Sequence, residues 1–175
     1  MFSMLAVLFF ALTGITLNHP EWTFGGGEST TEVSGRLPTG WRSGSQVDWL
    51  VVADYLRQHH GVRGTVADRR VEGSEASISF KAPGYSADCF VDLGTGSYQL
   101  TAASQGFVGA LNDFHRGRDA GSAWAWLVDL AGVFLALLSI TGIGLLLYLR
   151  KLRGRGLALL ALGCALVVCL MKLAT

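Results

Sequence analysis

The chain has 175 residues, of which 50% are hydrophobic and only 15% are charged, and its formal net charge is +1. A soluble domain of this length rarely combines so few charges with a mean hydropathy of +0.40. The acidic and basic residues avoid three long apolar runs, which excludes a single soluble globular domain and predicts a membrane protein.

The first run is expected to form a transmembrane helix over residues 1–19. No Asp, Glu, Lys or Arg occurs between Met1 and Pro20. A helix from Met1 to Leu17 would be about 25 Å long, which is at the short limit for a hydrocarbon core of about 30 Å. A cleaved secretory signal is one alternative, but the run lacks its basic start and small-residue cleavage site. A second alternative is a natural start upstream of Met1.

Residues 20–120 are expected to form a small α+β domain. The stretch from Glu21 to Gly44 is rich in Gly, Ser and Thr and is interpreted as an irregular linker. A helix is predicted to begin at Ser45, which can cap its first turn, and to end at Gly61. Strands and a second helix are predicted beyond it, with the strands at about 62–71, 76–80, 85–93 and 98–102 and the helix at about 107–114.

Two further apolar runs predict transmembrane helices over residues 122–149 and 156–173. The loop between them, residues 150–155, contains four bases and no acid. Short basic loops stay in the cytoplasm, so the N-terminus is expected there too and the domain is expected outside. The stretch from Glu21 to Asp119 has 12 acids and 9 bases, which agrees with this orientation.

Several short motifs occur in a fixed order along the chain. The stretch Val91–Tyr98 reads VDLGTGSY, and residues 111–121 read LNDFHRGRDAG ahead of an apolar helix with the pair Thr141–Gly142 near its end. A similar pair, Thr13–Gly14, lies in the first run. Together these motifs resemble PepSY-associated transmembrane proteins over nearly the whole chain. The resemblance implies an α-helical integral membrane protein with three transmembrane helices and a small α+β PepSY-like periplasmic domain inserted between helices 1 and 2, in a bacterial inner membrane.

The resemblance also implies haem-linked redox work in iron metabolism, with electrons passing through b-type haem held by histidines. His115 and His19 would both lie at the outer membrane boundary and are the candidate haem ligands. Arg116 and Arg118 are candidate contacts for haem propionates or lipid phosphates. Larger members carry a further histidine ahead of the first helix, so this chain would bind one haem or none unless its start lies upstream.

Each of these residues also has a structural interpretation. An interfacial histidine needs no ligand, and His19 can simply end the first helix. His59 and His60 close the soluble helix, where an imidazolium suits the helix dipole. Asp129 is expected to face protein or water and to pair with Arg116 or Arg118, and proton handling is the alternative role.

Two functions of different classes follow. The first is a haem-linked electron-transfer subunit of the ferric-siderophore-reductase type, and the second is a non-enzymatic module that binds or inhibits a partner protein. A metal-binding sensor using His19, His115 and Asp113 is a third interpretation. Apart from the lipid bilayer, the expected partners are a second copy or a membrane or periplasmic redox protein, because three helices rarely enclose a haem; no nucleic acid is expected. No hydrolase motif occurs.

Overall fold

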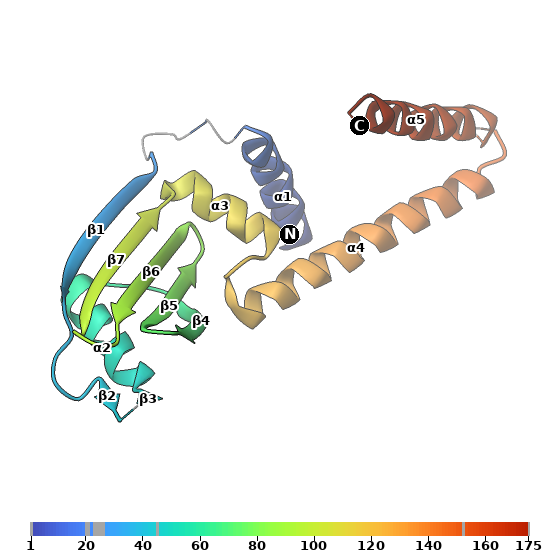
Figure 1. Cartoon of the computed structure of the whole chain (residues 1–175). Helices are drawn as coiled ribbons and strands as arrows, with labels where there is room; N and C mark the ends of the chain where they lie inside the picture. Colours follow the sequence, from blue (N-terminus) through green and yellow to red (C-terminus); the bar gives the residue numbers. More distant parts are fainter. Residues whose placement is uncertain (1, 20–21, 23–26, 45, 152, 175) are drawn as a thin grey trace. The chain divides into compact units, whose positions relative to one another are not determined.

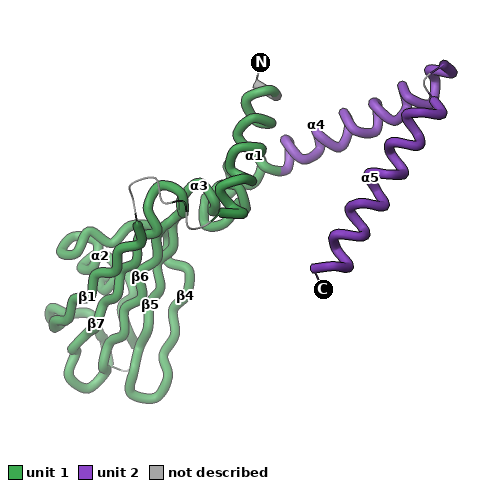
Figure 2. Tube along the Cα trace, turned by 90° about the horizontal axis from the view of Figure 1, so that it is seen from above, with its two compact units in different colours: residues 1–128 green, residues 129–175 purple. Residues whose placement is uncertain are grey.

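The computed structural model describes residues 2–19, 22, 27–44, 46–151 and 153–174 and divides into two compact units, residues 1–128 and 129–175 (Figure 2). Met1, Pro20, Glu21 and Ser45, which bound some of the expected elements, lie outside the described residues.

The first unit is built on a five-stranded antiparallel sheet with the strand order β1-β7-β6-β5-β4 (Figure 1). The strands are β1 (Ser29–Arg36), β4 (Thr65–Glu72), β5 (Glu75–Ala82), β6 (Tyr85–Asp92) and β7 (Ser97–Ser104). A separate two-stranded ribbon joins β2 (Arg42–Ser43) to β3 (Gln46–Val47). The four strands predicted for the meander are present as β4 to β7, and all their pairings are antiparallel, with one register shift in β4 between Val66 and Asp68.

Strand β1 corrects the prediction of an irregular linker between Glu21 and Gly44. It pairs along its whole length with β7, from Ser29 opposite Ser104 to Arg36 opposite Ser97. Its sequence, STTEVSGR, has one large apolar residue, Val33, and lacks the alternation that marks a half-buried strand. The strand forms through backbone pairing at the sheet edge, and its polar side chains suit that exposed position.

Helix α2 (Trp49–His60) begins three residues later than a helix capped by Ser45 would begin. Its N-cap is Asp48, whose Oδ1 accepts hydrogen bonds from the backbone N–H groups of Leu50 and Val51. The predicted end is confirmed, because Gly61 takes a left-handed conformation with φ +63°.

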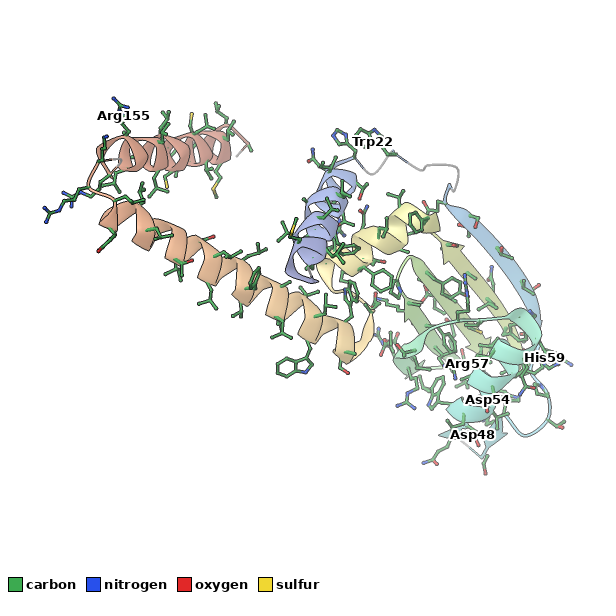
Figure 3. The ribbon with its side chains drawn as sticks, turned by 180° about the vertical axis from the view of Figure 1, so that it is seen from behind. Trp22, Asp48, Asp54, Arg57, His59 and Arg155 are labelled. Atoms are coloured by element: carbon green, nitrogen blue, oxygen red, sulfur yellow. The ribbon has the colours of Figure 1, made fainter. Side chains whose placement is uncertain are left out.

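One face of α2 is buried against the sheet, while Asp54, Arg57 and His59 of the same helix are exposed (Figure 3). Val52 and Leu56 of the helix are fully buried, as are the largest sheet side chains that they join in the core. Those sheet residues alternate along β5, β6 and β7: Ile78, Phe80, Cys89, Val91 and Leu100. The core of the domain is therefore the layer between α2 and the central strands.

Cys89 is a free thiol at the centre of this layer, with no exposed surface. Burial raises the pKa of the thiol from 9.0 to about 12. Because the thiolate is the reactive form, the folded domain keeps this cysteine inert.

We expect Cys89 to resist a water-soluble maleimide at pH 8 until the domain unfolds, in a Cys164→Ser/Cys169→Ser background. Since the folded pKa is raised, the stabilisation from burying the neutral thiol is complete below pH 9 and is lost as the pH rises toward 12. Mass spectrometry should find no adduct on the native protein and one adduct in denaturant. Rapid labelling of the native protein at pH 8 would contradict the buried position.

Three further helices complete the chain: α3 (Gly106–Arg116), α4 (Gly121–Tyr148) and α5 (Arg153–Ala174). Helices α4 and α5 have 28 and 22 residues, or about 42 and 33 Å, and neither has a buried residue. Both are long and apolar enough to cross a membrane. Helix α1 (Phe2–Asn18) is apolar but shorter, with 17 residues.

Candidate functional site

The hairpin loop between β6 and β7 contains part of the motif that resembles PepSY domains, and its polar residues have a local role. Asp92 Oδ1 accepts hydrogen bonds from the backbone N–H and the hydroxyl of Thr95, each at 2.7 Å. The Thr95 hydroxyl and N–H lower the pKa of the Asp92 carboxyl below its ordinary value. Gly96 completes the turn with φ +70°. These bonds shape a tight turn.

The residues expected to carry chemistry gather instead where α1 lies beside α3 (Figure 1). Thr13 Oγ1 lies 2.7 Å from His115 Nδ1, and Thr16 Oγ1 donates to Asn112 Oδ1 at 3.0 Å. The partner on α3 moves back by three residues as the position on α1 advances by three, so the helices run antiparallel here. Two hydrogen bonds thus join segments about a hundred residues apart.

The bond to Thr13 orients the His115 ring. The Thr13 hydroxyl lies 2.7 Å from both the backbone carbonyl of Phe9 and His115 Nδ1. When the hydroxyl donates its single proton to the carbonyl, its oxygen accepts from Nδ1–H, and Nε2 is then the nitrogen with a free lone pair in the neutral ring. Among the described residues, none forms a hydrogen bond with Nε2. The geometry therefore yields an oriented imidazole whose Nε2 has no hydrogen-bond partner in the described part of the chain.

Aromatic rings pack around this histidine. Phe10 meets the His115 ring edge-on with centroids 5.3 Å apart, and Gly14 leaves room beside it, since a Cβ there would lie 3.6 Å from His115 Cε1. Trp124, in the first turn of α4, packs against Phe9 at 5.7 Å and Phe114 at 4.8 Å. Such ring pairs contribute about 0.5–1.5 kcal/mol each beyond their buried area, so the α1–α3 contact is ordered on several sides.

Helix α3 is also tied to the sheet, at the turn between β5 and β6. The backbone N–H of Gly84 donates to Asp113 Oδ2 at 2.8 Å, and the N–H of Gln105 donates to the carbonyl of Gly84 at 2.8 Å. The helix ends in Gly117, whose φ is +68°. Because Asp113 is two residues from His115, this anchoring also sets the position of the imidazole relative to the sheet.

The second candidate ligand, His19, lies six residues beyond Thr13, which corresponds to about 9 Å along a helix. Its ring stacks on Trp22 with centroids 4.3 Å apart and an interplanar angle of 7°. The structure thus places His115 beside the middle of α1 and His19 just past its end. A Thr13–His115 pair is formed, and the expected pairing of the two histidines as ligands stays a prediction.

The remaining histidines of the first unit have partners within the soluble domain. His59 Nδ1 lies 3.1 Å from the carbonyl of Tyr55, and His60 Nε2 lies 2.6 Å from the hydroxyl of Tyr98. Burial and the neighbouring Tyr55 raise the pKa of Tyr98 to about 12, so this phenol stays protonated as a hydrogen-bonding group. These contacts join the end of α2 to β7.

The two candidate arginines differ in their surroundings. Arg116 is exposed at the end of α3 and lines a cavity with Asn112 and Asp113. Arg118 follows Gly117, and its backbone N–H donates to the carbonyl of Asp113 at 2.9 Å. Asp129 belongs to the second unit, so its pairing with either arginine stays a prediction.

Sequence reasoning missed the partners that orient His115. Thr13 and Asn112 stood in the quoted motifs without a role, and Asp113 was considered only as a metal ligand. A signal was present for Thr13, because a polar side chain in an uncharged apolar helix needs a partner when it is away from water. The identity of that partner required the fold.

The whole chain, residues 1–175, matches the protein family described as "Putative PepSY_TM-like". The chain belongs to this family. No curated protein and no solved structure is significantly similar to it. Membership in the PepSY_TM-like family together with two long apolar helices identifies a membrane protein with an antiparallel sheet domain.

The metal-sensor interpretation is wrong for the described part of the chain. His19, His115 and Asp113 are all described, and no three His, Cys, Asp or Glu residues in that part form a group that could hold a metal ion. The Asp113 carboxylate is instead engaged by the backbone of Gly84. The chemistry of the site therefore rests on a single oriented imidazole.

Proposed function

We propose that this PepSY_TM-like protein crosses a bacterial inner membrane three times, through α1, α4 and α5, and holds its sheet domain in the periplasm. We further propose that His115 would hold a b-type haem used for electron transfer in iron metabolism, in the manner of a ferric-siderophore reductase. The observation that supports the second proposal is the Thr13–His115 hydrogen bond at Nδ1, which leaves Nε2 without a hydrogen-bond partner among the described residues.

The burial pattern of α1 supports its role as a third span. Among the described side chains of α1, Thr13 is buried at 4% exposure, whereas apolar residues such as Leu5, Leu8 and Leu12 are more than half exposed. A helix of a soluble domain has the opposite pattern. Apolar side chains outward and a hydrogen-bonded threonine inward are what a lipid environment favours. At about 25 Å, the helix is at the short limit for a span and would cross a locally thinned bilayer.

The basic loop supports the orientation. Arg150 and Lys151 lie between α4 and α5, Arg153 and Arg155 lie in the first turn of α5, and bases near such helix ends favour the cytoplasmic side. The N-terminus of α1 is then also cytoplasmic, and the outer end of α1 is the one that leads to the sheet. His115 lies beside Thr13, about five residues inside that end, so it sits near the outer boundary of the hydrocarbon.

The donor set fits a haem ligand. A ligating histidine usually donates its other ring N–H to a fixed acceptor, which orients the ring and raises its basicity, and the Thr13 oxygen is positioned to be that acceptor. Arg118 is the candidate for a propionate, because Arg116 lines a separate cavity. When bound, the haem would supply one-electron chemistry, while the chain orients the imidazole and packs Phe10 against it, with Phe9 beside Phe10. His19 or a residue of a partner would be the other candidate ligand.

A second candidate function is a non-enzymatic module that binds a partner protein. The observation that favours it is that Thr13–His115, Thr16–Asn112 and the Trp124 N–H bond to the carbonyl of Phe114 all fasten helices together. In this alternative, His115 has a structural role and fixes the orientation of the sheet domain relative to α1.

One spectroscopic experiment separates the two functions. The purified full chain, expressed with added haem precursor, should show a b-type absorption band that is absent from His115→Ala. Thr13→Val should keep the ligand but lower haem affinity by about 10–100-fold, since the acceptor for Nδ1–H is lost. Thr13→Ser retains the hydroxyl and should bind haem as the original chain does.

His59→Ala is the matched control, because His59 is exposed on α2 and belongs to no part of this contact. Circular dichroism and thermal melting must show that each variant is folded. A folded, colourless protein after haem addition would exclude the haem function for this chain and leave the binding module.

A further inference from the structure

A cavity of about 360 Å³ with a mixed polar and apolar lining lies along one side of α3, away from the α1 contact of His115. Its helix residues follow helical spacing, and Glu28, directly ahead of β1, closes the far end. The polar lining residues are Glu28, Gln105, Asn112, Asp113 and Arg116. The cavity thus brings one guanidinium, two carboxylates and two amides together.

The charges in this cavity are available for a ligand. Within the described part of the chain, neither the Arg116 side chain nor the Glu28 side chain forms a hydrogen bond or an ion pair, although both line the same cavity. Asp113 uses Oδ2 for the Gly84 N–H and keeps Oδ1. Asn112 uses Oδ1 for Thr16 and keeps its amide donors. Opposite charges at the two ends of the cavity, Arg116 and Glu28, suit a small zwitterion.

The two ends of the cavity lie at different depths in the proposed membrane topology. Helix α3 runs antiparallel to α1, so its C-terminal end, with Arg116, is the end nearer the bilayer. Glu28 precedes Ser29, which pairs with Ser104 just ahead of α3, so Glu28 lies at the N-terminal end of that helix. A lipid headgroup entering from the bilayer would meet Arg116 first and Glu28 last.

We propose that this cavity binds the headgroup of a phosphoethanolamine lipid. Arg116 and Asn112 hold the phosphate, which is the deeper part of the headgroup, and Glu28 holds the terminal ammonium. A primary ammonium donates three hydrogen bonds, whereas a trimethylammonium donates none, so the Glu28 carboxylate discriminates between the two common zwitterionic headgroups. The proposal rests on the membrane topology proposed above and is independent of haem binding.

The test is native mass spectrometry of the purified full chain from micelles with equal amounts of phosphatidylethanolamine, phosphatidylcholine and phosphatidylglycerol carrying identical acyl chains. We expect phosphatidylethanolamine to be retained about tenfold over phosphatidylcholine. Glu28→Gln should reduce that preference about three- to fivefold, and Arg116→Gln should reduce retention of all three lipids. Soluble glycerophosphoethanolamine at the same concentration should displace none of the bound lipid.

Glu32→Gln and Arg69→Gln are the charge-matched controls, since both residues are exposed on strands outside the cavity. Equal retention of the two zwitterionic lipids, unchanged by Glu28→Gln, would overturn the proposal. Displacement by glycerophosphoethanolamine would overturn the lipid as the occupant and assign the cavity to a free phosphoamine. Because the readout is bound lipid mass, loss of the b-type band in the haem experiment leaves this result unaffected.

Discussion

Replacing Phe80 with alanine is expected to destabilise the sheet domain by about 3–5 kcal/mol. The Phe80 side chain has no exposed surface, packs in the layer between α2 and the central strands, and has Arg57 stacked over its ring at 5.6 Å. Its removal leaves a cavity in a rigid sheet. A change of this size is a large part of the 5–15 kcal/mol that stabilises a typical domain.

Cys89 supplies the readout for this variant, because it lies two positions along the register on the adjacent strand and reacts only when the domain opens. Maleimide labelling in the Cys164→Ser/Cys169→Ser background should accelerate by roughly 10²–10³-fold in Phe80→Ala. Phe90→Ala is the control, since Phe90 is 48% exposed on the opposite face of β6. Equal effects of the two substitutions would contradict the assignment of the core to the α2 face.

Replacing Gly84 with alanine is expected to displace α3 from the sheet. Gly84 has φ +65°, and a Cβ there would lie 2.6 Å from the backbone nitrogen and 2.8 Å from the Cα of Ala110. Relief of this overlap requires movement of backbone, which also breaks the Gly84–Asp113 bond. We expect a loss of more than about 2 kcal/mol, beyond the 1–2 kcal/mol for left-handed backbone alone. Hydrogen exchange should show faster exchange in residues 106–116 and unchanged protection in α2.

Gly73→Ala separates the two causes of that loss. Gly73 has φ +59° in the β4–β5 turn, but no atom lies within 4 Å of a Cβ at this position. It therefore reports the cost of backbone conformation without the overlap. If Gly84→Ala costs no more than Gly73→Ala, the close packing of the turn on α3 is wrong.

The elements predicted from sequence were those whose pattern of apolar residues is strong. The meander β4 to β7 and the stop of α2 at Gly61 follow from alternation and from glycine chemistry, and both are present. Strand β1 was missed because its stability comes from backbone pairing with β7, which STTEVSGR does not reveal. The start of α2 was misplaced because Asp48 and Ser45 are equally good caps by residue type, and only the short β3 pairing excludes the earlier one.

The sequence identified individual residues of the candidate site but not the contacts between them. His115 and Arg116 were identified from their motif, but their surroundings depend on α3 being a separate helix that lies beside α1. The contact between Thr13 and His115 spans 102 positions of sequence, and no local pattern encodes such a distance. The cavity beside Arg116 depends equally on β1, which brings Glu28 to α3.

The threonines of α1 bear on the order in which this protein assembles during synthesis. Helix α1 leaves the ribosome roughly a hundred residues ahead of α3. Until α3 is synthesised, the polar side chains of α1 therefore need other hydrogen-bond partners. Thr13 and Thr16 meet that requirement by donating to carbonyls of their own helix, those of Phe9 and Thr13. The helix can therefore lie in apolar surroundings with its hydroxyls satisfied. His115 then adds a bond to the Thr13 oxygen, whereas Thr16 redirects its single proton from the Thr13 carbonyl to Asn112 Oδ1.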